Sequence, residues 1–580
     1  MDKKTTSIIL LTVLYSILFY DQHVGLNFLL FTLALLGLFF FQNKKSFKKR
    51  SVQLLSVACI FSATFAVIHG SYLSMWATII SLMLIPGAIL NKTSNILIDF
   101  ATTFINIGGS PAFMIIDSVN SSKDGKSKGF LQVLKYLVPT VFIIAFFFIY
   151  RSMNPLFENA TQDIADLISL GYVFFTLGGF ALVYSIYKQK RAKEVDAWEE
   201  NNSLNIIEKE TKAPQWNEGI AFIILFIVLN IMLISVNFMD IHYLYLGEGM
   251  PDGITHKQFL HKGVGMIILS ILLGISLLLF FFRGALNFDK NQKLIKLLAF
   301  LWVIQNVFMV ISTTLRNNIY VDEALLSYKR IGVYFWLLFA LIGLITLFVK
   351  LLKNKSLWFL MRYNFIVLFV VFIMSSAFDW DMIISKFNIN RAKQVNEISS
   401  YDKRYLLSLS EGNIAELHSI KEMKGFEVDS LYSYAYDDGF RHSNKNWLDT
   451  KVYDFLAGDE DGDWRSYSTR RYKVRKDIQQ LNQLGELDTL DLRNSYSIKT
   501  IAPLAELTQL KSLNLSGCSI TDWENLKLFK SLETLTISYV SAEDIEHFKQ
   551  LPKLKSLNIE SSNVKVLNKF IESLPNVKVY

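Results

Sequence analysis

The sequence predicts an α-helical polytopic membrane bundle of about eleven spans, followed by an extracytoplasmic domain of short helices and an α/β repeat solenoid. Three observations predict this fold. Of the 580 residues, 52% are hydrophobic and only 19% are charged, whereas about 25% are charged in typical soluble domains. The apolar excess lies almost wholly before residue 380. After it, the pattern L-x-x-L-x-L recurs at a nearly fixed period.

The predicted spans are mostly apolar runs that approach the roughly 20 residues needed to cross a bilayer. A further segment, 95–117, is long enough but contains Asp99, Asn106 and Pro111. An Asp at the centre of a membrane helix costs about 2.5–3.5 kcal/mol, so we expect an interfacial or re-entrant helix there. The predicted spans are 6–20, 26–41, 52–69, 71–90, 132–150, 170–187, 217–237, 263–282, 294–313, 331–349 and 356–377.

The loops between these spans alternate between strongly basic and nearly free of Lys and Arg. One alternating set, together with Lys3 and Lys4, holds 24 basic residues and the other holds six. The positive-inside rule then places the N-terminus in the cytoplasm and residues after 378 outside it. We therefore expect a multi-pass protein of the inner cell membrane with an extracytoplasmic C-terminal domain. The six basic residues on the outer side are Arg151, Lys257, Lys262, Arg316, Lys329 and Arg330.

The C-terminal pattern predicts a leucine-rich-repeat array. The motif starts at Leu487, Leu510, Leu532 and Leu554, at intervals of 23, 22 and 22 residues, which is the period and consensus of this repeat. Cys518 falls at a turn position that packs inward. The alternate strand residues should form a polar inner face, on which the candidate partner-binding residues are Asp491, Arg493, Asn514, Asn558 and Glu560.

These patterns predict three regions: a membrane domain at 1–378, a helical linker or cap region at 379–486, and the repeat array at 487–580. The segment "STRRYKVRKDIQQL", at 468–481, leads into the first repeat and is expected to cap the array as a helix.

Several stretches carry a resemblance to a known family. These are "FLHKGVGMIILSILLGISLLLFFFRGALNF" from Phe259, "WVIQN" from Trp302, "RNNIYVDEALLSYKRIGVYFWL" from Arg316 and "FDWDMIISKFNINRA" from Phe378. They resemble the bacterial multi-pass membrane family called domain of unknown function 4153/4173, mainly over residues 215–480, with "YLLSLS" and "WRSY" in its soluble extension. Lys262 departs from the family pattern, which has an acidic residue there. The resemblance implies a multi-pass envelope protein and no reaction, and the repeat array is an appendage to the family core.

Few residues have a type and spacing typical of a metal site or a catalytic site. The outer loop after residue 239 gathers Asp240, His242 and several further acidic and His side chains, yet it lacks the helical spacing of a zinc pair. We interpret it as a solvated loop and expect no metal or cofactor. No phosphate-binding loop or catalytic triad motif is present, so an enzyme is less favoured than a non-enzymatic protein. The basic residues separate apolar runs instead of forming one face, which argues against nucleic acid as a partner.

Two groups of polar residues in the membrane domain are candidates for a structural role or a binding role. Arg316, Lys329 and Arg330 either snorkel to the surface or form an anion-attracting patch for a lipid headgroup or glycan phosphate. Gln305 and Asn306 lie inside a predicted span, where helix-to-helix hydrogen bonds are expected.

The favoured function is a non-enzymatic integral envelope protein whose membrane bundle, embedded in the lipid bilayer, anchors the repeat domain for binding an envelope protein or glycan. The alternative is a transporter, or a lipid- or glycan-handling protein, with the repeats as an accessory. Transport paths usually carry several ionisable groups at mid-membrane, and the predicted span centres carry almost none.

Overall fold

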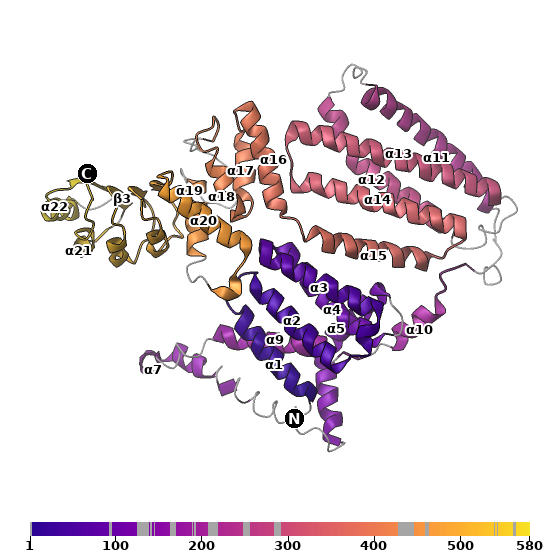
Figure 1. Cartoon of the computed structure of the whole chain (residues 1–580), viewed down its shortest axis with the longest axis horizontal. Coiled ribbons are helices and arrows are strands. Elements are labelled where there is room, and N and C mark those ends of the chain that lie inside the picture. Colours follow the sequence, from indigo (N-terminus) through magenta and orange to yellow (C-terminus); the bar gives the residue numbers. More distant parts are fainter. Residues whose placement is uncertain are drawn as a thin grey trace. The chain divides into compact units, whose positions relative to one another are not determined.

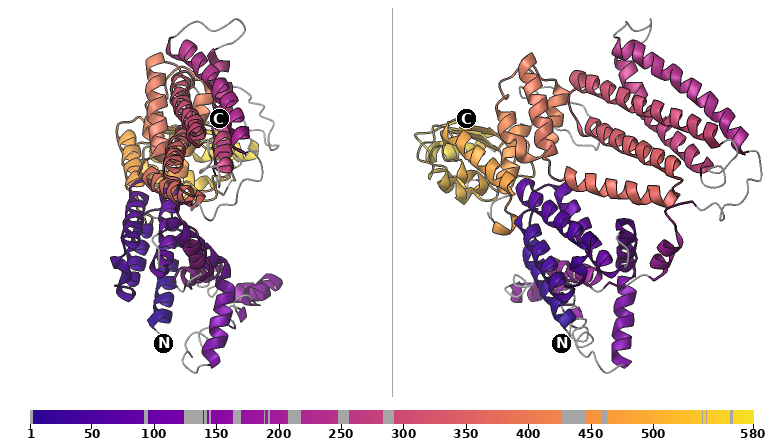
Figure 2. Two further views of the ribbon diagram at one scale, coloured as in Figure 1. Left: turned by 90° about the vertical axis from the view of Figure 1, so that its right-hand side faces the viewer. Right: turned by 45° about the vertical axis from the view of Figure 1, so that its right-hand side comes forward.

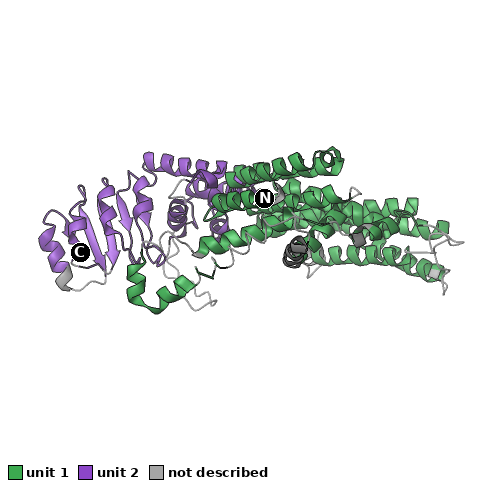
Figure 3. Ribbon diagram, turned by 90° about the horizontal axis from the view of Figure 1, so that it is seen from below, with its two compact units in different colours: residues 1–67, 71–377 green, residues 68–70, 378–580 purple. Residues whose placement is uncertain are grey.

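The computed structural model forms two compact units (Figure 3). Unit 1 comprises residues 1–67 and 71–377, and unit 2 comprises residues 68–70 and 378–580. The residues that the structure describes are 3–91, 95–123, 139, 142–143, 146–162, 170–187, 189–190, 193–206, 218–246, 256–282, 292–426, 446–458, 463–538, 540–541, 543–560 and 564–580.

Unit 1 is helical throughout its described part (Figure 1). Its helices are α1 (Lys3–Phe19), α2 (Leu26–Gln42), η1 (Ser46–Lys48), α3 (Arg50–His69), α4 (Tyr72–Leu90), α5 (Ile96–Lys123), α7 (Pro155–Ala160), α9 (Leu170–Tyr187), α10 (Lys193–Asn201), α11 (Glu218–Asp240), the π-helical turn η3 (Ile241–Tyr245), α12 (His256–Phe281), α13 (Gln292–Ala324), α14 (Tyr328–Lys353) and α15 (Leu357–Ser375).

Helix ends in unit 1 coincide with local capping signals. Ser71 precedes α4 and its hydroxyl accepts a hydrogen bond from Ser74 N, and Ser356 caps α15 in the same way. Asn354 ends α14 in the left-handed conformation, which Asn tolerates better than most residues. Lys49 donates to three carbonyl oxygens at the end of α4, where the helix has no hydrogens of its own to satisfy them.

Six helices in the described part of the chain are long and apolar enough to cross a membrane. They are α3, α4, α11 with its η3 extension, α13, α14 and α15. Many of their exposed side chains are large and apolar, such as Ile224, Ile231 and Phe238 on α11, as is expected where the surrounding medium is lipid. The prediction of a membrane protein is confirmed.

The described part of the chain supports six spans, which is fewer than the predicted count of about eleven. Four further predicted spans lie in helices whose described apolar parts have no more than 17 residues, although α12 as a whole runs from His256 to Phe281: Thr6–Phe19, Leu26–Gln42, Gly171–Tyr187 and Gly265–Phe281. Most of the predicted span 132–150 lies outside the described residues.

Segment 95–117 forms one continuous helix, α5, instead of a broken one. Asp99 is buried, and its carboxylate accepts a 2.7 Å hydrogen bond from Asn91 Nδ2. Asn106 is bonded in both directions to the main chain of Lys190. Asp99 and Asn106 thus have hydrogen-bond partners inside unit 1, and the interfacial placement of α5 stays a prediction.

Unit 2 combines short helices with a five-stranded parallel sheet whose strands follow sequence order, β1-β2-β3-β4-β5. Its elements are α16 (Trp380–Val395), α17 (Ser400–Ser408), η5 (Glu411–Asn413), α18 (Ile414–His418), α19 (Trp447–Ala457), η6 (Trp464–Ser466), α20 (Thr469–Gln483), β1 (Thr489–Asp491), η7 (Ala502–Glu506), β2 (Ser512–Asn514), η8 (Trp523–Leu528), β3 (Thr534–Ser538), α21 (Ile545–Phe548), β4 (Ser556–Glu560), α22 (Val564–Ser573) and β5 (Lys578–Val579).

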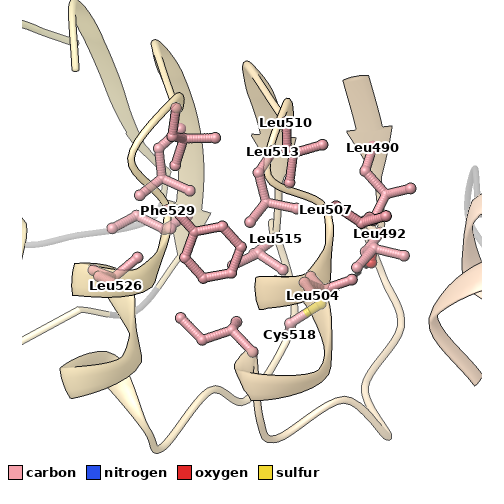
Figure 4. Packing of buried hydrophobic residues seen from close by; sticks show 14 of the residues in the cluster. Leu490, Leu492, Leu504, Leu507, Leu510, Leu513, Leu515, Cys518, Leu526 and Phe529 are labelled. Carbon is pink, nitrogen blue, oxygen red and sulfur yellow. Dashed lines mark hydrogen bonds between the residues drawn. The ribbon is translucent and has the colours of Figure 1, made fainter. Parts of the chain in front are cut away.

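The strand register follows the sequence repeat. Leu490 pairs with Leu513, Leu513 with Leu535, and Leu535 with Leu557. All four side chains are fully buried, and Figure 4 shows the first two pointing into the same core as the leucines of η7 and η8. Because side chains alternate across a strand, the residues on either side of each leucine are directed to the opposite face.

Cys518 packs in this core, as predicted. It is 6% exposed and its thiol lies 3.2 Å from the carbonyl oxygen of Leu492 (Figure 4). Its position at the turn after β2 therefore makes it a structural residue.

The first edge of the sheet is covered by helices. Val452 and Leu456 of α19 and Val474 and Ile478 of α20 belong to the same apolar core as the strand leucines. The prediction of a helix at 468–481 is confirmed by α20, but α19 also covers this edge. This matters because an uncovered parallel edge strand exposes a row of unpaired main-chain groups.

Candidate functional site: the polar face of the C-terminal sheet

The face of the sheet opposite the leucine core carries two rows of polar side chains, which we call the polar face. The register aligns Thr489, Ser512, Thr534, Ser556 and Lys578 in one row, and Asp491, Asn514, Thr536 and Asn558 in the next. Except for the exposed Thr489 and Lys578, these side chains are partly buried. The face thus presents mainly hydroxyl and carboxamide groups, which can both donate and accept hydrogen bonds.

Three of the five predicted partner-binding residues, Asp491, Asn514 and Asn558, lie in one row. Glu560 lies one row further along β4, opposite Ser538, and Arg493 follows β1 by two residues. The structure therefore brings all five to the same face, although no contact here shows what they bind.

Three of the five are already engaged within the chain. Arg493 Nη2 lies 2.6 Å from Asp491 Oδ2, and Arg493 Nε donates to the same carboxylate. The hydrogen bond to Asp491 raises the pKa of Arg493, and the charge of Glu560 raises it further. Asn514 Oδ1 accepts from Ser516 N at 3.0 Å. Asp491 and Arg493 thus form a neutral pair beside a row of uncharged polar groups.

The first edge of the polar face is terminated by a carboxylate that sequence reasoning missed. Asp449, on α19, accepts a 2.7 Å hydrogen bond from the main-chain N of Asp491, where a further strand would otherwise pair. Burial raises the pKa of Asp449 to about 7; the hydrogen bond from Asp491 N acts in the opposite direction. No sequence signal identifies this residue, because its partner is a main-chain group 42 residues away.

The predicted anion patch is divided between different environments in unit 1. Arg316 is 6% exposed and forms an ion pair with Asp240. Arg330 donates to the carbonyl oxygen of Leu325 and stacks 4.6 Å from the ring centre of Tyr320. Lys329 is exposed. The charge of Arg316 is thus balanced within the chain, and anion binding by the three residues stays a prediction.

The placement of Asp240 corrects the interpretation of its loop as solvated. Asp240 ends α11, is only 1% exposed and pairs with Arg316 on α13. The sequence interpretation was wrong here because the apolar run of α11 ends just before Asp240, which suggested water beyond it. Residues 247–255 of the same loop lie outside the described residues.

Gln305 makes the predicted helix-to-helix bond, donating to Asn230 on α11 at 2.6 Å. Asn306 donates instead to Trp302 O on its own helix. Within the part of the chain that the structure describes, no three His, Cys, Asp or Glu side chains lie together in a way that could hold a metal ion.

Comparison with known proteins identifies a family but no characterised relative. No curated protein and no solved structure matches the chain. A family profile, described as Domain of unknown function (DUF4153), matches residues 5–420. The match begins earlier than the resemblance over 215–480 suggested, and it ends before Trp464 and before the sheet. Because it covers well over half of the 580 residues, this chain belongs to the DUF4153 family.

Proposed function

We infer that this protein is a non-enzymatic anchor that presents its polar face to an envelope partner, a protein or a glycan, on the outside of the inner membrane of a bacterial cell. In this proposal residues 487–580 form a leucine-rich-repeat array appended to the family domain. The lipid bilayer holds unit 1, and residues 379–486 connect the last membrane helix to the array.

The observation that carries the proposal is the alignment of the repeats. The paired leucines of successive strands are 22 or 23 residues apart, the same as the intervals of the L-x-x-L-x-L motif. In repeat proteins of this period, each unit contributes one strand, and the strands together line an extended binding surface. The polar face has that position here.

Contacts within unit 2, between the start of its first helix and a helix of the array core, support an anchoring role. The chain leaves α15 at Ser375 and enters α16 at Trp380. Asp379 caps α16 through Met382 N, and both of its oxygens lie 3.4 Å from Arg470 Nη1 on α20. Since α20 shares the apolar core of the sheet, this ion pair links the start of unit 2 to the array.

Site-specific photocrosslinking in native membranes tests the proposal. A photoreactive residue at Thr534, on the polar face, should give a discrete adduct. The same residue at Glu546, an exposed position of α21 outside the polar face, is the matched control and should give none. Mass spectrometry, with and without glycan-degrading enzymes, then separates a protein partner from a glycan. Equal labelling at both positions, or none at either, would argue against the proposed docking face.

A second candidate is a transporter, or a lipid- or glycan-handling protein. The buried ion pair between Asp240 and Arg316 favours it, because charged residues inside membrane domains commonly mark transport or substrate paths. This candidate uses unit 1 and makes the array an accessory. Uptake or efflux measured in proteoliposomes would distinguish it from the anchor, which transports nothing.

A further inference from the structure

Two segments of unit 2 that are far apart in the sequence meet at one ion pair. Asp379 directly precedes α16, and both of its carboxylate oxygens lie 3.4 Å from Nη1 of Arg470, near the start of α20. Figure 2 shows α20 in orange beside the yellow strands of the sheet, with which it shares an apolar core. The start of α20 is therefore held next to residue 379.

Asp379 also lies at the ends of two membrane helices. His69 is the last residue of α3, and its Nδ1 lies 4.0 Å from Asp379 Oδ2. This contact lies within unit 2, because that unit includes residues 68–70. Ser375 is the last residue of α15 and is four positions before Asp379, a distance that the chain spans in at most about 14 Å. The start of α20 is therefore close to the membrane ends of this part of the chain.

The first aromatic side chains near this ion pair are the sequence neighbours of Asp379. The ring centres of Phe378 and Trp380 lie 5.3 Å apart. Phe378 is 49% exposed, so a large apolar ring is directed out of unit 2 immediately after the last membrane helix.

A second aromatic group surrounds Arg470 in the sequence. Tyr467 and Tyr472 have ring centres 6.3 Å apart. They are 43% and 58% exposed, and Trp464, in the turn η6 before them, is 58% exposed. We call the five residues of both groups the aromatic rim: Phe378, Trp380, Trp464, Tyr467 and Tyr472.

Basic side chains accompany the aromatic rim. Lys476 is four residues after Tyr472 and three after Lys473, so these three exposed residues border one strip of α20. The stretch 463–476 contains six basic residues and one acidic residue. Three of the six pair with carboxylates: Arg465 with Asp463, Arg470 with Asp379 and Arg475 with Glu506. Six positive charges against these three carboxylates leave an excess of three positive charges.

We propose that the aromatic rim lies among the phospholipid headgroups of the bilayer that holds unit 1, and that Lys473 and Lys476 attract anionic headgroups there. Trp and Tyr are enriched at membrane–water interfaces, because each ring combines an apolar body with a polar group. Basic side chains close to the membrane surface are attracted to anionic lipid. Unit 2 is thereby held at the membrane by side chains as well as by its chain connection. The proposal does not depend on what the polar face binds.

Photocrosslinking in vesicles is the direct test. The full-length protein, with a photoreactive residue at Tyr467, is reconstituted into vesicles of phosphatidylcholine and phosphatidylglycerol. We expect a phospholipid adduct, which mass spectrometry detects on the labelled peptide. The same residue at Leu368, exposed on membrane helix α15, should also give a lipid adduct. At Glu546, exposed on α21, it should give none.

Three results would overturn the proposal. The first is a lipid adduct at Leu368 without one at Tyr467. The second is an equal yield of lipid adduct at Tyr467 and Glu546, because labelling would then not depend on the aromatic rim. The third is an adduct between Tyr467 and a second copy of the chain in place of lipid, which would make the aromatic rim a protein interface.

A matched pair of double variants tests the role of charge. In the wild type, phosphatidylglycerol should form a larger share of the Tyr467 adducts than of the vesicles. Changing Lys473→Gln together with Lys476→Gln should lower this enrichment at least about fivefold, the ratio that about 1 kcal/mol for a single near-surface cation gives at 25 °C. Lys527→Gln together with Lys530→Gln makes the same change at exposed lysines in and after η8 and should leave the enrichment as it is. Equal enrichment in the two double variants would contradict the role of Lys473 and Lys476.

Discussion

At the scale of single residues, two buried groups of unit 2 make opposite contributions to its stability. Leu513 is fully buried and is paired with leucines on both neighbouring strands. Asp449 has a buried carboxylate that accepts a hydrogen bond from the main-chain N of Asp491, at the edge of the sheet. Burial of the Leu513 side chain stabilises the folded state, because an apolar group leaves water. Burial of the Asp449 carboxylate destabilises the folded state whenever the group is charged, because the charge loses its hydration.

Replacing Leu513 with Asp should unfold the array and leave unit 1 inserted in the membrane. A charge at this position has no partner, which should cost at least about 3 kcal/mol, and the damage should spread because neighbouring repeats share one core. Limited proteolysis in vesicles that expose unit 2 would show rapid loss of the C-terminal region. Ser512→Asp, on the polar face, should stay resistant. Wild-type resistance of Leu513→Asp would contradict the inward orientation of that residue.

Asp449 should make unit 2 less stable as the pH rises from about 4 to about 7. Burial raises its pKa from 3.8 to about 7, so in this range the folded state binds a proton that the unfolded state has released. Stability then falls with pH.

In Asp449→Asn this contribution is absent, and the side chain can still accept from Asp491 N. Denaturant unfolding from pH 4 to 8 should show the variant gaining stability relative to the wild type up to about pH 7, with a constant difference beyond. A constant difference over the whole range would show that Asp449 titrates normally.

At the scale of elements, close helix approach in unit 1 depends on small residues, as is common in membrane bundles. Gly274 of α12 faces the indole of Trp302 on α13, so a Cβ at position 274 would overlap the ring. Gly265 lies on the same helix and has open space where its Cβ would be. The two glycines therefore form a natural test pair.

Gly274→Ala should separate α12 from α13 and lower the Tm of unit 1, because Trp302 is buried in the core shared by these helices and cannot move freely. We expect a loss of about 1–3 kcal/mol, the usual cost of overpacking. Gly265→Ala should leave the Tm unchanged or slightly higher, since Ala favours helix over Gly. Thermal unfolding in detergent measures both, and equal effects of the two changes would contradict the close contact at Gly274.

At the scale of the whole molecule, the family domain and the two compact units divide the chain at different places. The DUF4153 match extends to residue 420 and so includes α16 to α18 of unit 2. The sheet lies entirely beyond the match. The boundary of the family domain therefore lies among the short helices of unit 2 and not between the two units.

The loop charges predict the orientation of the chain in the membrane, and this prediction can be measured directly. A reporter enzyme that is active only outside the cytoplasm, fused after Tyr580, should be active because the basic loops favour the cytoplasmic side. A fluorescent reporter that matures only in the cytoplasm should stay dark at the same position. The opposite pattern would reverse the topology and favour α5 as an additional span.

Sequence alone determined the features that depend on local pattern. The apolar runs predicted the membrane helices, because burying main-chain polar groups in lipid requires helix over the whole crossing. The leucine spacing predicted which residues of 487–580 form the core and which form the polar face, because a strand alternates its two faces at every residue. Cys518 was assigned correctly for the same reason.

Only the tertiary structure decided which distant polar groups meet. Asp240 and Arg316 are 76 residues apart, and Asp449 is bonded to a main-chain nitrogen; neither pairing has a spacing that a pattern could reveal. Local patterns reflect the solvent that each residue faces, whereas pairing reflects how helices far apart in the chain pack.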